Sequence, residues 1–464
     1  MQLVAYGAQD IYLTGNPQIT YFKVVYRRHT NFAIESIEQT FNGVGDFARK
    51  VTVTVARNGD LIWKAYVQVK LPRVETNGCS FRWVDDVGHH LIKCVEIEIG
   101  GQRIDRQFGE WLQIWNDLTI PAGQRRGYQK MIGGSVRGEG QLPGSLQQWS
   151  PATRLSRVLY IPLQFWFNRN IGLALPLIAL QYHEVKINVE FRPACELVIT
   201  ANPALTNLCL DAATMYIDYI YLDTDERRRF AQVSHEYLIE QLQFTGEESI
   251  CNNANKFRLN FNHPVKELIW VIQHDDLICH SDVNDLEGVL ANNQWSNFTD
   301  VLGSLTYDHA FPLLSGNPVE FAKLQLNGHD RFSTRLGDYF NLVQPYQHHT
   351  NIPLSPGINV YSFAIRPEEH QPSGSCNFSR IDNATLQITV KYCNTLLEDC
   401  TVDTTGLPAS FVEEIEPFLG CSLEGCNLDA KFRIYAVNYN VLRIMSGIKT
   451  NQNDSNLCPT VSCH

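Results

Sequence analysis

The side chains best suited to metal or acid–base chemistry occur as adjacent pairs. The pairs are His89-His90, His348-His349, Asp85-Asp86 and Asp275-Asp276. Histidine nitrogens are common zinc ligands, and carboxylate oxygens are common calcium ligands, so each pair is a candidate for part of a metal site. Pairs of this kind stand more often in turns or in packed interiors. We therefore expect turn or packing roles for all four pairs and no bound metal.

The chain contains thirteen cysteines, and two groups of them invite a metal interpretation. One group runs from His274 through Cys279-His280. The other is an acidic loop that holds Cys393, Cys400, Cys421 and Cys426. A structural zinc site usually has two cysteines at a Cys-x2-Cys spacing, and neither group has it. We expect buried or surface thiols for the most part, and a disulfide between loop cysteines is the alternative if the protein meets an oxidising exterior.

The chain lacks the local signatures of common enzymes. It has no Gly-x-x-x-x-Gly-Lys phosphate loop, no Gly-x-Ser-x-Gly elbow and no His-Glu-x-x-His motif. The glycine-rich stretch 133–140 does not lie between a strand and a helix, so we interpret it as a flexible loop. Trp149 and Trp295 are the loop aromatics that could line a sugar site, whereas the other tryptophans that can be placed fall in core patterns. The sequence predicts no catalytic residue and no cofactor.

Four asparagines lie in Asn-x-Ser/Thr sequences, which accept N-linked glycans in proteins that meet the glycosylation machinery. They are Asn297, Asn377, Asn383 and Asn453. The segment that begins Met1-Gln2 lacks the charged start and the apolar stretch of a signal peptide, and it lacks the second-position glycine of a myristoylation signal. We therefore expect a cytosolic protein, unless something carries it out, and unmodified asparagines by default.

Composition describes a folded protein without a broad nucleic-acid surface. The 464 residues are 44% hydrophobic and 19% charged. This length fits two domains of about 200 residues each. The net charge of −11 argues against binding DNA or RNA through a wide basic face. The basic runs Arg125-Arg126 and Arg227–Arg229 are expected to be solvated or salt-bridged, and no apolar run reaches the roughly 18–20 residues that span a bilayer.

Most of the chain shows the alternation of apolar and polar residues that half-buried strands require. The clearest alternating runs are 51–55, 67–71 and 95–99. The segments 215–222 and 432–442 are apolar on both faces, so we expect both to be covered on both sides, for example by the neighbouring domain. Helical spacing is rarer and predicts short helices at 108–115, 223–230, 339–343 and 410–417.

Fragments of the first half of the chain return in the same order in the second half. Leu61-Ile62-Trp63 returns as Leu268-Ile269-Trp270, and Gly109-Glu110-Trp111-Leu112 returns as Gly337-Asp338-Tyr339-Phe340. The further matches pair Ile37–Gln39 with Ile239–Gln241, Ala48 and Lys50 with Ala254 and Lys256, Gly101 with Gly328, Val185–Phe191 with Leu386–Tyr392, and Asp218-Tyr219 with Asn438-Tyr439. An ordered series of this kind indicates a tandem duplication of one domain.

Changes in the offset between matches locate three loops of unequal length in the two copies. They fall at 119–157, 271–318 and 393–431. Loops run over the surface and tolerate insertions, so these stretches should be the most exposed parts of the chain. Each copy then has about eight short strands with one or two helices in loops, which predicts a β-sandwich. Periodicity does not give strand order, so a jelly roll and an immunoglobulin-like sandwich both fit.

Three segments at the start, middle and end of the chain are distinctive. They are 7–33 (GAQDIYLTGNPQITYFKVVYRRHTNFA), 222–231 (LDTDERRRFA) and 435–444 (YAVNYNVLRI). Together they resemble the major capsid proteins of nucleocytoplasmic large DNA viruses, a group that includes iridoviruses, phycodnaviruses and marseilleviruses. The resemblance implies an all-β fold of two tandem eight-stranded jelly rolls with short helices in loops. It divides the chain into an N-terminal arm (1–31), a first jelly roll (32–222), a second jelly roll (223–445) and a C-terminal tail (446–464) without an assigned role.

The resemblance implies a structural protein rather than an enzyme. Three chains of two similar domains present six similar edges, so a homotrimer would form a capsomer with a nearly hexagonal outline. Capsomers would tile the icosahedral shell of a large double-stranded DNA virus, in contact with neighbouring capsomers and with minor capsid and penton proteins. The N-terminal arm would face an inner viral membrane, and the loops 119–157 and 271–318 would rise on the outer face. The protein would be assembled in the host cytoplasm and reside in the virion, without direct nucleic-acid contact.

Two other functions remain open from the sequence. A tandem β-sandwich could bind or cleave carbohydrate, although a glycosidase needs two carboxylates that face each other across a cleft. A minor penton-type protein or a host-derived scaffold is the third candidate, and a penton usually has one jelly roll rather than two. A stable trimer near three times 52.8 kDa supports the capsid interpretation, whereas a monomer that binds a sugar column contradicts it.

Overall fold

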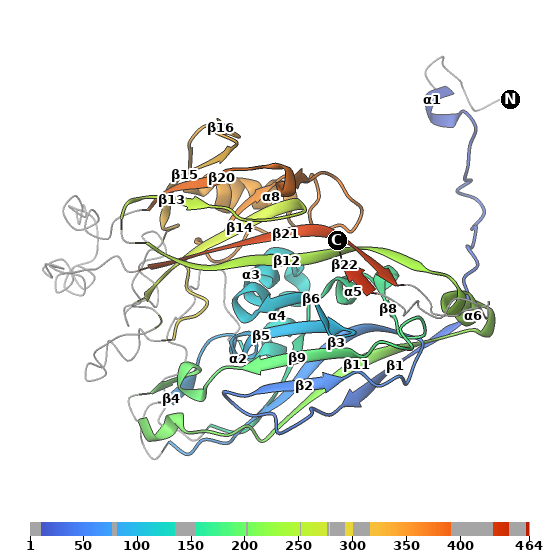
Figure 1. Cartoon of the computed structure of the whole chain (residues 1–464), viewed down its shortest axis with the longest axis horizontal. Helices are drawn as coiled ribbons and strands as arrows, with labels where there is room; N and C mark the ends of the chain where they lie inside the picture. Colours follow the sequence, from blue (N-terminus) through green and yellow to red (C-terminus); the bar gives the residue numbers. More distant parts are fainter. Residues whose placement is uncertain are drawn as a thin grey trace, which may run out of the picture.

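Two β-sandwiches lie one above the other in the computed structural model, and an extended N-terminal arm leaves the body of the protein (Figure 1). The structure describes residues 11–76, 81–134, 154–200, 203–250, 252–275, 278, 293–299, 316–390, 430–444 and 461–463. Within these residues, every helix is too short or too polar to cross a membrane. In the part of the arm that the structure describes, residues 11–31, a helical turn, α1 (Ile11–Thr14), precedes the first strand, which begins at Phe32.

The first sandwich has two sheets, and each sheet contains four of its eight main strands. One sheet has the order β1-β11-β3-β7, and the other has the order β2-β9-β5-β6. Counted along the chain, these orders are first-eighth-third-sixth and second-seventh-fourth-fifth, which is the arrangement of a jelly roll. The strands are β1 (Phe32–Gln39), β2 (Lys50–Thr54), β3 (Leu61–Leu71), β5 (Ile92–Ile99), β6 (Gln102–Phe108), β7 (Arg157–Pro162), β9 (Val185–Phe191) and β11 (Ala212–Leu222).

The first sandwich also contains short strands and helices outside its eight main strands. The additional strands are β4 (Phe81–Trp83), β8 (Leu175–Pro176) and β10 (Val198–Thr200). The helices are α2 (Val87–Leu91), α3 (Gly109–Thr119), α4 (Ala122–Ile132) and α5 (Trp166–Arg169), with the 3-10 turns η1 (Ile171–Leu173), η2 (Ala194–Glu196) and η3 (Pro203–Thr206). Helix α6 (Thr224–Gln232) connects the two sandwiches, and the Asp223 carboxylate caps it by accepting a 2.7 Å hydrogen bond from the Thr224 N–H. The predicted helices at 108–115 and 223–230 are thus confirmed.

The second sandwich repeats the same strand order. Its sheets are β12-β21-β14-β18 and β13-β20-β15-β16, which confirms tandem jelly rolls and removes the immunoglobulin-like alternative. The strands are β12 (His235–Ile250), β13 (Ala254–Arg258), β14 (Pro264–His274), β15 (Val319–Leu326), β16 (His329–Asp330), β17 (Arg335–Leu336), β18 (Asn359–Ser362), β19 (Cys376–Asn377), β20 (Ala384–Val390), β21 (Ala430–Ile444) and β22 (Val461–Cys463). The helical elements are η5 (Tyr339–Val343), α8 (Gln344–His348) and η6 (Phe378–Arg380), and η5 is a π-helical turn at the predicted helix 339–343.

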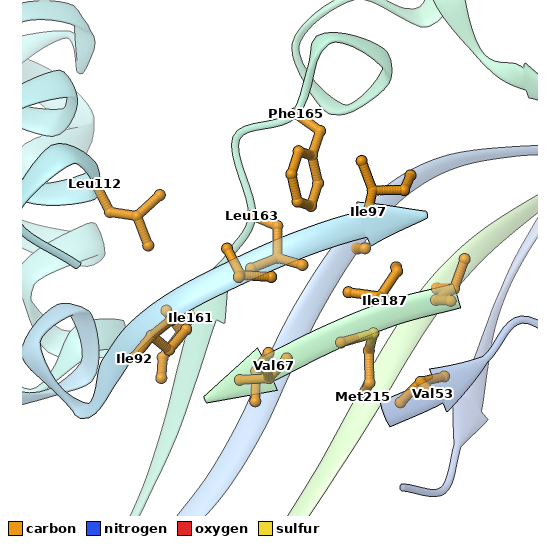
Figure 2. Close-up of a cluster of buried hydrophobic side chains, with 14 of the residues drawn as sticks. Val53, Val67, Ile92, Ile97, Leu112, Ile161, Leu163, Phe165, Ile187 and Met215 are labelled. Carbon is orange, nitrogen blue, oxygen red and sulfur yellow. The ribbon is translucent and has the colours of Figure 1, made fainter. Parts of the chain in front are cut away.

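The core of the first sandwich follows from the alternation within its strands. Figure 2 shows side chains from both sheets meeting between them, among them Val53, Val67, Ile187 and Met215. Leu112 of α3 belongs to the same core. Burying each such side chain stabilises the fold by about 1.5–3 kcal/mol. The alternating runs that predicted strands are confirmed as parts of β2, β3 and β5.

Two glycines occupy the same place in the two sandwiches. Gly109 begins α3, and a side chain there would collide with the carbonyl oxygen of Ile92, the first residue of β5. Gly337 precedes η5, and a side chain there would collide with the carbonyl oxygen of Val319, the first residue of β15. Only glycine permits this close approach of two backbones. This match of the sequence repeat is therefore a structural equivalence.

The repeated Leu-Ile-Trp fragments lie on corresponding strands but not at corresponding positions. In β3, Ile62 points into the first core. In β14, Ile269 points away from the second core, and its neighbours Leu268 and Trp270 point into it. The expectation that the fragments are equivalent is wrong, because neighbouring residues of a strand face opposite sides and the two fragments stand in opposite phase.

A β-bulge that both copies share gives the correct correspondence. In β3 it separates the core residues Ile62 and Ala65, and in β14 it separates the core residues Val265 and Leu268. Aligning the bulges and following the strand pairing places Tyr66 with Ile269, and Tyr216 with Tyr435, on the outer faces. The same pairing places Tyr219 with Asn438, so the predicted match of Asp218-Tyr219 with Asn438-Tyr439 is off by one position.

The predicted loops are described only in part. In 119–157, helix α4 is mostly exposed, in line with the expectation. In 271–318, the segment Gln294–Thr299 is buried, so the expectation of exposure is wrong for these residues. They pack between the sandwiches, where the Trp295 indole N–H donates a 2.8 Å hydrogen bond to the Glu196 carbonyl oxygen. Residues 393–429, the predicted helix 410–417, Trp149 and Asn453 lie outside the described residues.

Candidate assembly surfaces

The first histidine pair has a packing role. His89 is buried, its Nδ1 lies 2.7 Å from Gln113 Oε1, and its Nε2 lies 2.8 Å from the Tyr128 hydroxyl. Burial lowers the pKa of His89 to about 4, so the ring is neutral at pH 7. His90 is also buried, with its Nε2 2.6 Å from Ser296 Oγ. Both rings join α2 to its surroundings.

The second histidine pair includes a buried cation. His349 Nε2 lies 3.0 Å from Glu267 Oε2, and His349 Nδ1 lies 2.9 Å from Glu368 Oε1. Burial alone would lower the pKa of His349, but the two carboxylates outweigh burial and raise it to about 9. The carboxylates contact opposite ring nitrogens, so the three groups do not converge on one point. Among the described residues, no set of three or more His, Cys, Asp or Glu side chains could hold a metal ion.

The other candidate residues fall into two environments. Trp295 is buried with the Arg192 guanidinium 4.0 Å above its ring, so this tryptophan, which the sequence left open as a sugar-site candidate, is a packing residue. Asn297 is buried and donates a 2.8 Å hydrogen bond to Gln294 Oε1, which removes it from the surface of the folded chain. Asn377 and Asn383 are exposed.

Helix α3 of the first sandwich covers the outer face of one sheet of the second sandwich. We define the covered face as Ile269 and Val271 of β14 with Tyr435 and Val437 of β21. The helix residues that pack against it are Trp111, Ile114, Trp115 and Leu118, all at most 4% exposed. The Trp111 and Tyr435 ring centroids lie 5.3 Å apart. This apolar contact fixes one sandwich against the other, and it confirms that the segment 432–442 is covered on both sides.

Polar contacts extend this junction along the sheet edge. The Gln241 side-chain amide of β12 donates to the Ile104 carbonyl oxygen of β6, and the Leu242 N–H donates a 3.0 Å hydrogen bond to Asp105 Oδ1. Burial raises the pKa of Asp105 to about 6. The first sandwich thus contacts the edge strand β12, and the contact provides a hydrogen-bond partner for the backbone N–H of Leu242.

A buried carboxylate joins charges from both sandwiches. Glu240 of β12 lies 3.0 Å from Arg169 Nη1 of the first sandwich and 2.7 Å from Lys266 Nζ of β14. Lys266 is fully buried, and it also donates to the Pro367 carbonyl oxygen. Burial lowers the pKa of the Lys266 ammonium, and the neighbouring carboxylates oppose that shift. Removing one partner from such a group leaves a buried charge without compensation.

The corresponding face of the first sandwich is not covered. We define the open face as the outer side of β3, β7 and β11, with Tyr66, Tyr160 and Tyr216 at its centre. The Tyr66 and Tyr216 rings stack with centroids 5.3 Å apart, and Tyr160 lies 6.1 Å from Tyr66. A groove of about 820 Å³ runs beside these rings, between Trp63, Pro162 and α4. The expectation that the segment 215–222 is covered on both sides is therefore wrong for the single chain.

The N-terminal arm is a second exposed apolar region. Its side chains Tyr21, Phe22 and Tyr26 are 91%, 99% and 83% exposed. The arm points away from the sandwiches (Figure 1). An extended segment that exposes aromatic rings is typical of a region that orders against a partner.

Comparison with known proteins places the whole chain in one family. A family profile described as "Major capsid protein N-terminus" matches residues 20–223, and one described as "Large eukaryotic DNA virus major capsid protein" matches residues 226–450. The major capsid protein of Phaeocystis pouchetii virus is 48% identical, over 97% of this chain and 98% of its own length. The major capsid protein of Paramecium bursaria Chlorella virus 1 is 42% identical, over 96% of this chain and 97% of its own.

Solved structures give the same result. A chain of the quasi-atomic model of the PBCV-1 virus capsid is 37% identical with a TM-score of 0.70, over 92% of this chain and 98% of that one. The faustovirus major capsid protein has a TM-score of 0.69 at 13% identity, over 95% of this chain and 94% of that one, and supports the fold alone. The relatives are structural proteins, not enzymes. This chain belongs to the major capsid proteins of large eukaryotic DNA viruses.

Proposed function

We propose that three copies of this chain form a capsomer with a nearly hexagonal outline, and that such capsomers tile the icosahedral shell of a large double-stranded DNA virus. The observation that carries the proposal is the repetition of one strand order in both halves of the chain. Three chains of two like sandwiches offer six like sides, so a threefold assembly fits into a lattice of sixfold neighbours. The similarity to a chain of the PBCV-1 capsid supports a place in the shell.

Native mass spectrometry of the full chain tests the trimer. The expected species has a mass near three times 52.8 kDa at low micromolar concentration. Two-dimensional class averages from electron microscopy should show the near-hexagonal outline. A chain that stays monomeric up to tens of micromolar, or that forms only dimers, contradicts the proposal.

Further partners follow from the place in a shell. Neighbouring capsomers, minor capsid proteins and penton proteins would contact the outer sides and the base of each capsomer. We assign the arm at 1–31 to the capsid interior, where its exposed aromatic side chains would meet an inner viral membrane. Flotation with phosphatidylcholine–phosphatidylserine vesicles tests this role: the full chain should float, and a chain that starts at residue 32 should not. Equal behaviour of the two chains contradicts it.

The location and the absence of nucleic-acid contact are part of the same proposal. The net charge of −11 disfavours binding to a polyanion, so filter binding at low salt should retain no double-stranded DNA. Immunogold labelling of infected cells should find the protein in virions and at cytoplasmic assembly sites. Labelling confined to the nucleus contradicts the cytoplasmic assembly.

Modification of the chain is open to a simple measurement. Asn377 and Asn383 are exposed and could carry glycans only if the protein meets the glycosylation machinery, whereas Asn297 is buried in the fold. Our proposal is an unmodified chain with no cofactor. The intact mass of the protein from purified virions should equal the sequence mass, and a surplus of whole hexose units contradicts this.

A further inference from the structure

A cavity of about 300 Å³ lies between the two sandwiches, beside the first turn of α3. Both sandwiches contribute basic side chains to its wall. Lys93, Arg106 and Arg192 come from the first sandwich, and Lys431 and Arg433 come from the second. A cavity of this size holds several waters, or a compact ligand in their place. We call it the junction cavity.

The carboxylates of the junction cavity are already engaged by arginines. They belong to Glu110, Glu196 and Glu247. Arg192 Nη2 contacts the Glu110 carboxylate, and Arg192 Nη1 lies 3.2 Å from Glu196 Oε2. Arg433 Nη2 lies 2.8 Å from Glu247 Oε1. Each arginine holds its carboxylates in charge-assisted hydrogen bonds, so these oxygens are poorly placed to bind a metal cation.

Arg192 keeps a hydrogen-bond donor that these ion pairs do not use. Its side chain is 8% exposed, and its Nε–H is buried without an acceptor among the described residues. The guanidinium lies 4.0 Å above the Trp295 ring, which fixes its plane. Helix α3 begins nearby, after Phe108, which has no polar side chain to cap the helix. The partial positive charge of this helix end adds to the charge of the guanidinium.

Two lysines at the junction cavity also retain donors. An ammonium group has three protons to donate. Lys93 uses one of them in a 2.9 Å ion pair with Glu190. Lys431 lies 3.6 Å from Asp275 and 3.8 Å from Glu247, distances that are long for hydrogen bonds. The two lysine side chains are 56% and 39% exposed, so both can turn toward a bound ligand without disturbing the core.

We propose that the junction cavity binds a compact oxyanion of the phosphate class, held by Arg192, Lys93 and Lys431. Carboxylates outside the cavity also contact its basic side chains, so the unused donors favour an anion more than the net charge does. A phosphate oxygen only accepts hydrogen bonds from such donors, and charge-assisted bonds of this kind are strong. The same group occurs in inorganic phosphate and in phosphomonoesters.

A bound phosphate group would connect the two sandwiches. Lys93 and Arg192 belong to the first sandwich, and Lys431 belongs to the second, at the start of β21. A ligand that binds only the folded chain stabilises it by mass action. The site goes beyond the proposed trimer and does not depend on it, because all three donors belong to one chain.

Isothermal titration calorimetry of the full chain with inorganic phosphate, at constant ionic strength, tests the site. The wild type should bind one phosphate per chain, and Lys431→Ala should bind it about tenfold more weakly or worse. Lys431 is partly exposed, so this variant should keep the wild-type thermal midpoint in phosphate-free buffer. The matched control Lys256→Ala, at an exposed position of β13, should bind phosphate like the wild type. A wild type that binds no phosphate, or equal binding by Lys431→Ala, overturns the inference.

Two further measurements identify the ligand and locate it. Titration with adenosine monophosphate separates the two sources: tighter binding than inorganic phosphate identifies a phosphomonoester, and weaker binding identifies free phosphate. Crystals of the full chain soaked in tungstate, a heavier tetrahedral oxyanion, should show an anomalous peak in the junction cavity beside Arg192. Tungstate peaks that lie only outside this cavity overturn the inference.

Discussion

The covered face and the open face share one backbone design but differ in their side chains. Ile269, Val271 and Val437 on the covered face are aliphatic and buried under α3, and Tyr435, the counterpart of Tyr216, is the tyrosine that the two faces share. Tyr66, Tyr160 and Tyr216 on the open face are aromatic, carry hydroxyls and are partly exposed. The same strand order underlies both faces. One copy of the duplicated fold thus carries an outer face that is buried when the chain folds, and the other copy carries an outer face that keeps contact with water in the single chain.

The largest loss of stability is expected when a tryptophan of α3 is removed from the covered face. Trp115→Ala should lower the free energy of unfolding by about 3–5 kcal/mol, because a large buried side chain leaves a cavity. Val343 stands as far after Gly337 as Trp115 stands after Gly109, but it is exposed, so Val343→Ala should change the stability of the unassembled chain by about 0.5 kcal/mol or less. Urea unfolding of both variants under conditions that keep the chain monomeric gives the two values. Equal losses of unfolding free energy in the two variants would contradict a buried role for α3 and an exposed position for Val343.

The next effect comes from the buried carboxylate at the junction. Glu240→Ala leaves Arg169 and the buried Lys266 without their shared partner, and it should cost about 3 kcal/mol. Glu35→Ala on β1, the counterpart strand at the open edge, is a matched control because Glu35 is exposed. The control should stay within about 0.5 kcal/mol of the wild type. A comparable loss in the control would mean that β1 is as constrained as β12, and this would contradict an open edge.

A smaller effect depends on pH. The pKa of His349 is raised to about 9 in the folded chain, above the ordinary value of 6.5, so its protonated form stabilises the fold. That contribution is fully present below about pH 6.5 and is lost as pH rises through about 9, and it is on the order of 1–3 kcal/mol. Burial lowers the pKa of Lys266, an effect of opposite sign, so the wild type must be compared with a His349→Asn variant at each pH.

Urea unfolding at pH 6, 7.5 and 9.5 measures this difference. The wild type should exceed the variant most at pH 6 and least at pH 9.5. His89 has the opposite shift, to about 4, and acts below about pH 6.5, but its contribution is common to the wild type and the variant and cancels in the difference. A difference between wild type and variant that stays constant from pH 6 to 9.5 would show that His349 does not titrate in this range.

Much of the fold could be predicted from the sequence, and the limits of the prediction have a physical cause. Alternation identified β2, β3 and β5, and the glycine pair Gly109 and Gly337 located equivalent turns because a backbone contact excludes every other residue there. The Leu-Ile-Trp match failed because a β-bulge changes the phase of a strand, and a bulge has no signature in residue types.

The assembly surfaces were only half visible in the sequence. Residues 215–222 and 432–442 look equally apolar, yet one sheet face is covered and the other is open. Which helix reaches which sheet depends on contacts between residues more than 150 positions apart, such as Trp115 with Ile269. The burial of Trp295 was missed for the same reason, since its partner Glu196 lies in the other sandwich.

The smallest change in stability is expected for a substitution on the open face. Tyr66→Ile gives the open face the residue that the covered face has at that position, and it removes only one partly buried ring. The free energy of unfolding of the monomer should change by about 0.5 kcal/mol or less. The unassembled chain should become less soluble, because the isoleucine lacks the hydroxyl and adds apolar area beside Tyr160 and Tyr216. Tyr182 is 69% exposed and lies outside the open face, so Tyr182→Ile should change solubility much less. Turbidity during dilution from denaturant measures this. If Tyr66→Ile stays as soluble as the control, the tyrosine hydroxyls do not keep the open face soluble in the single chain.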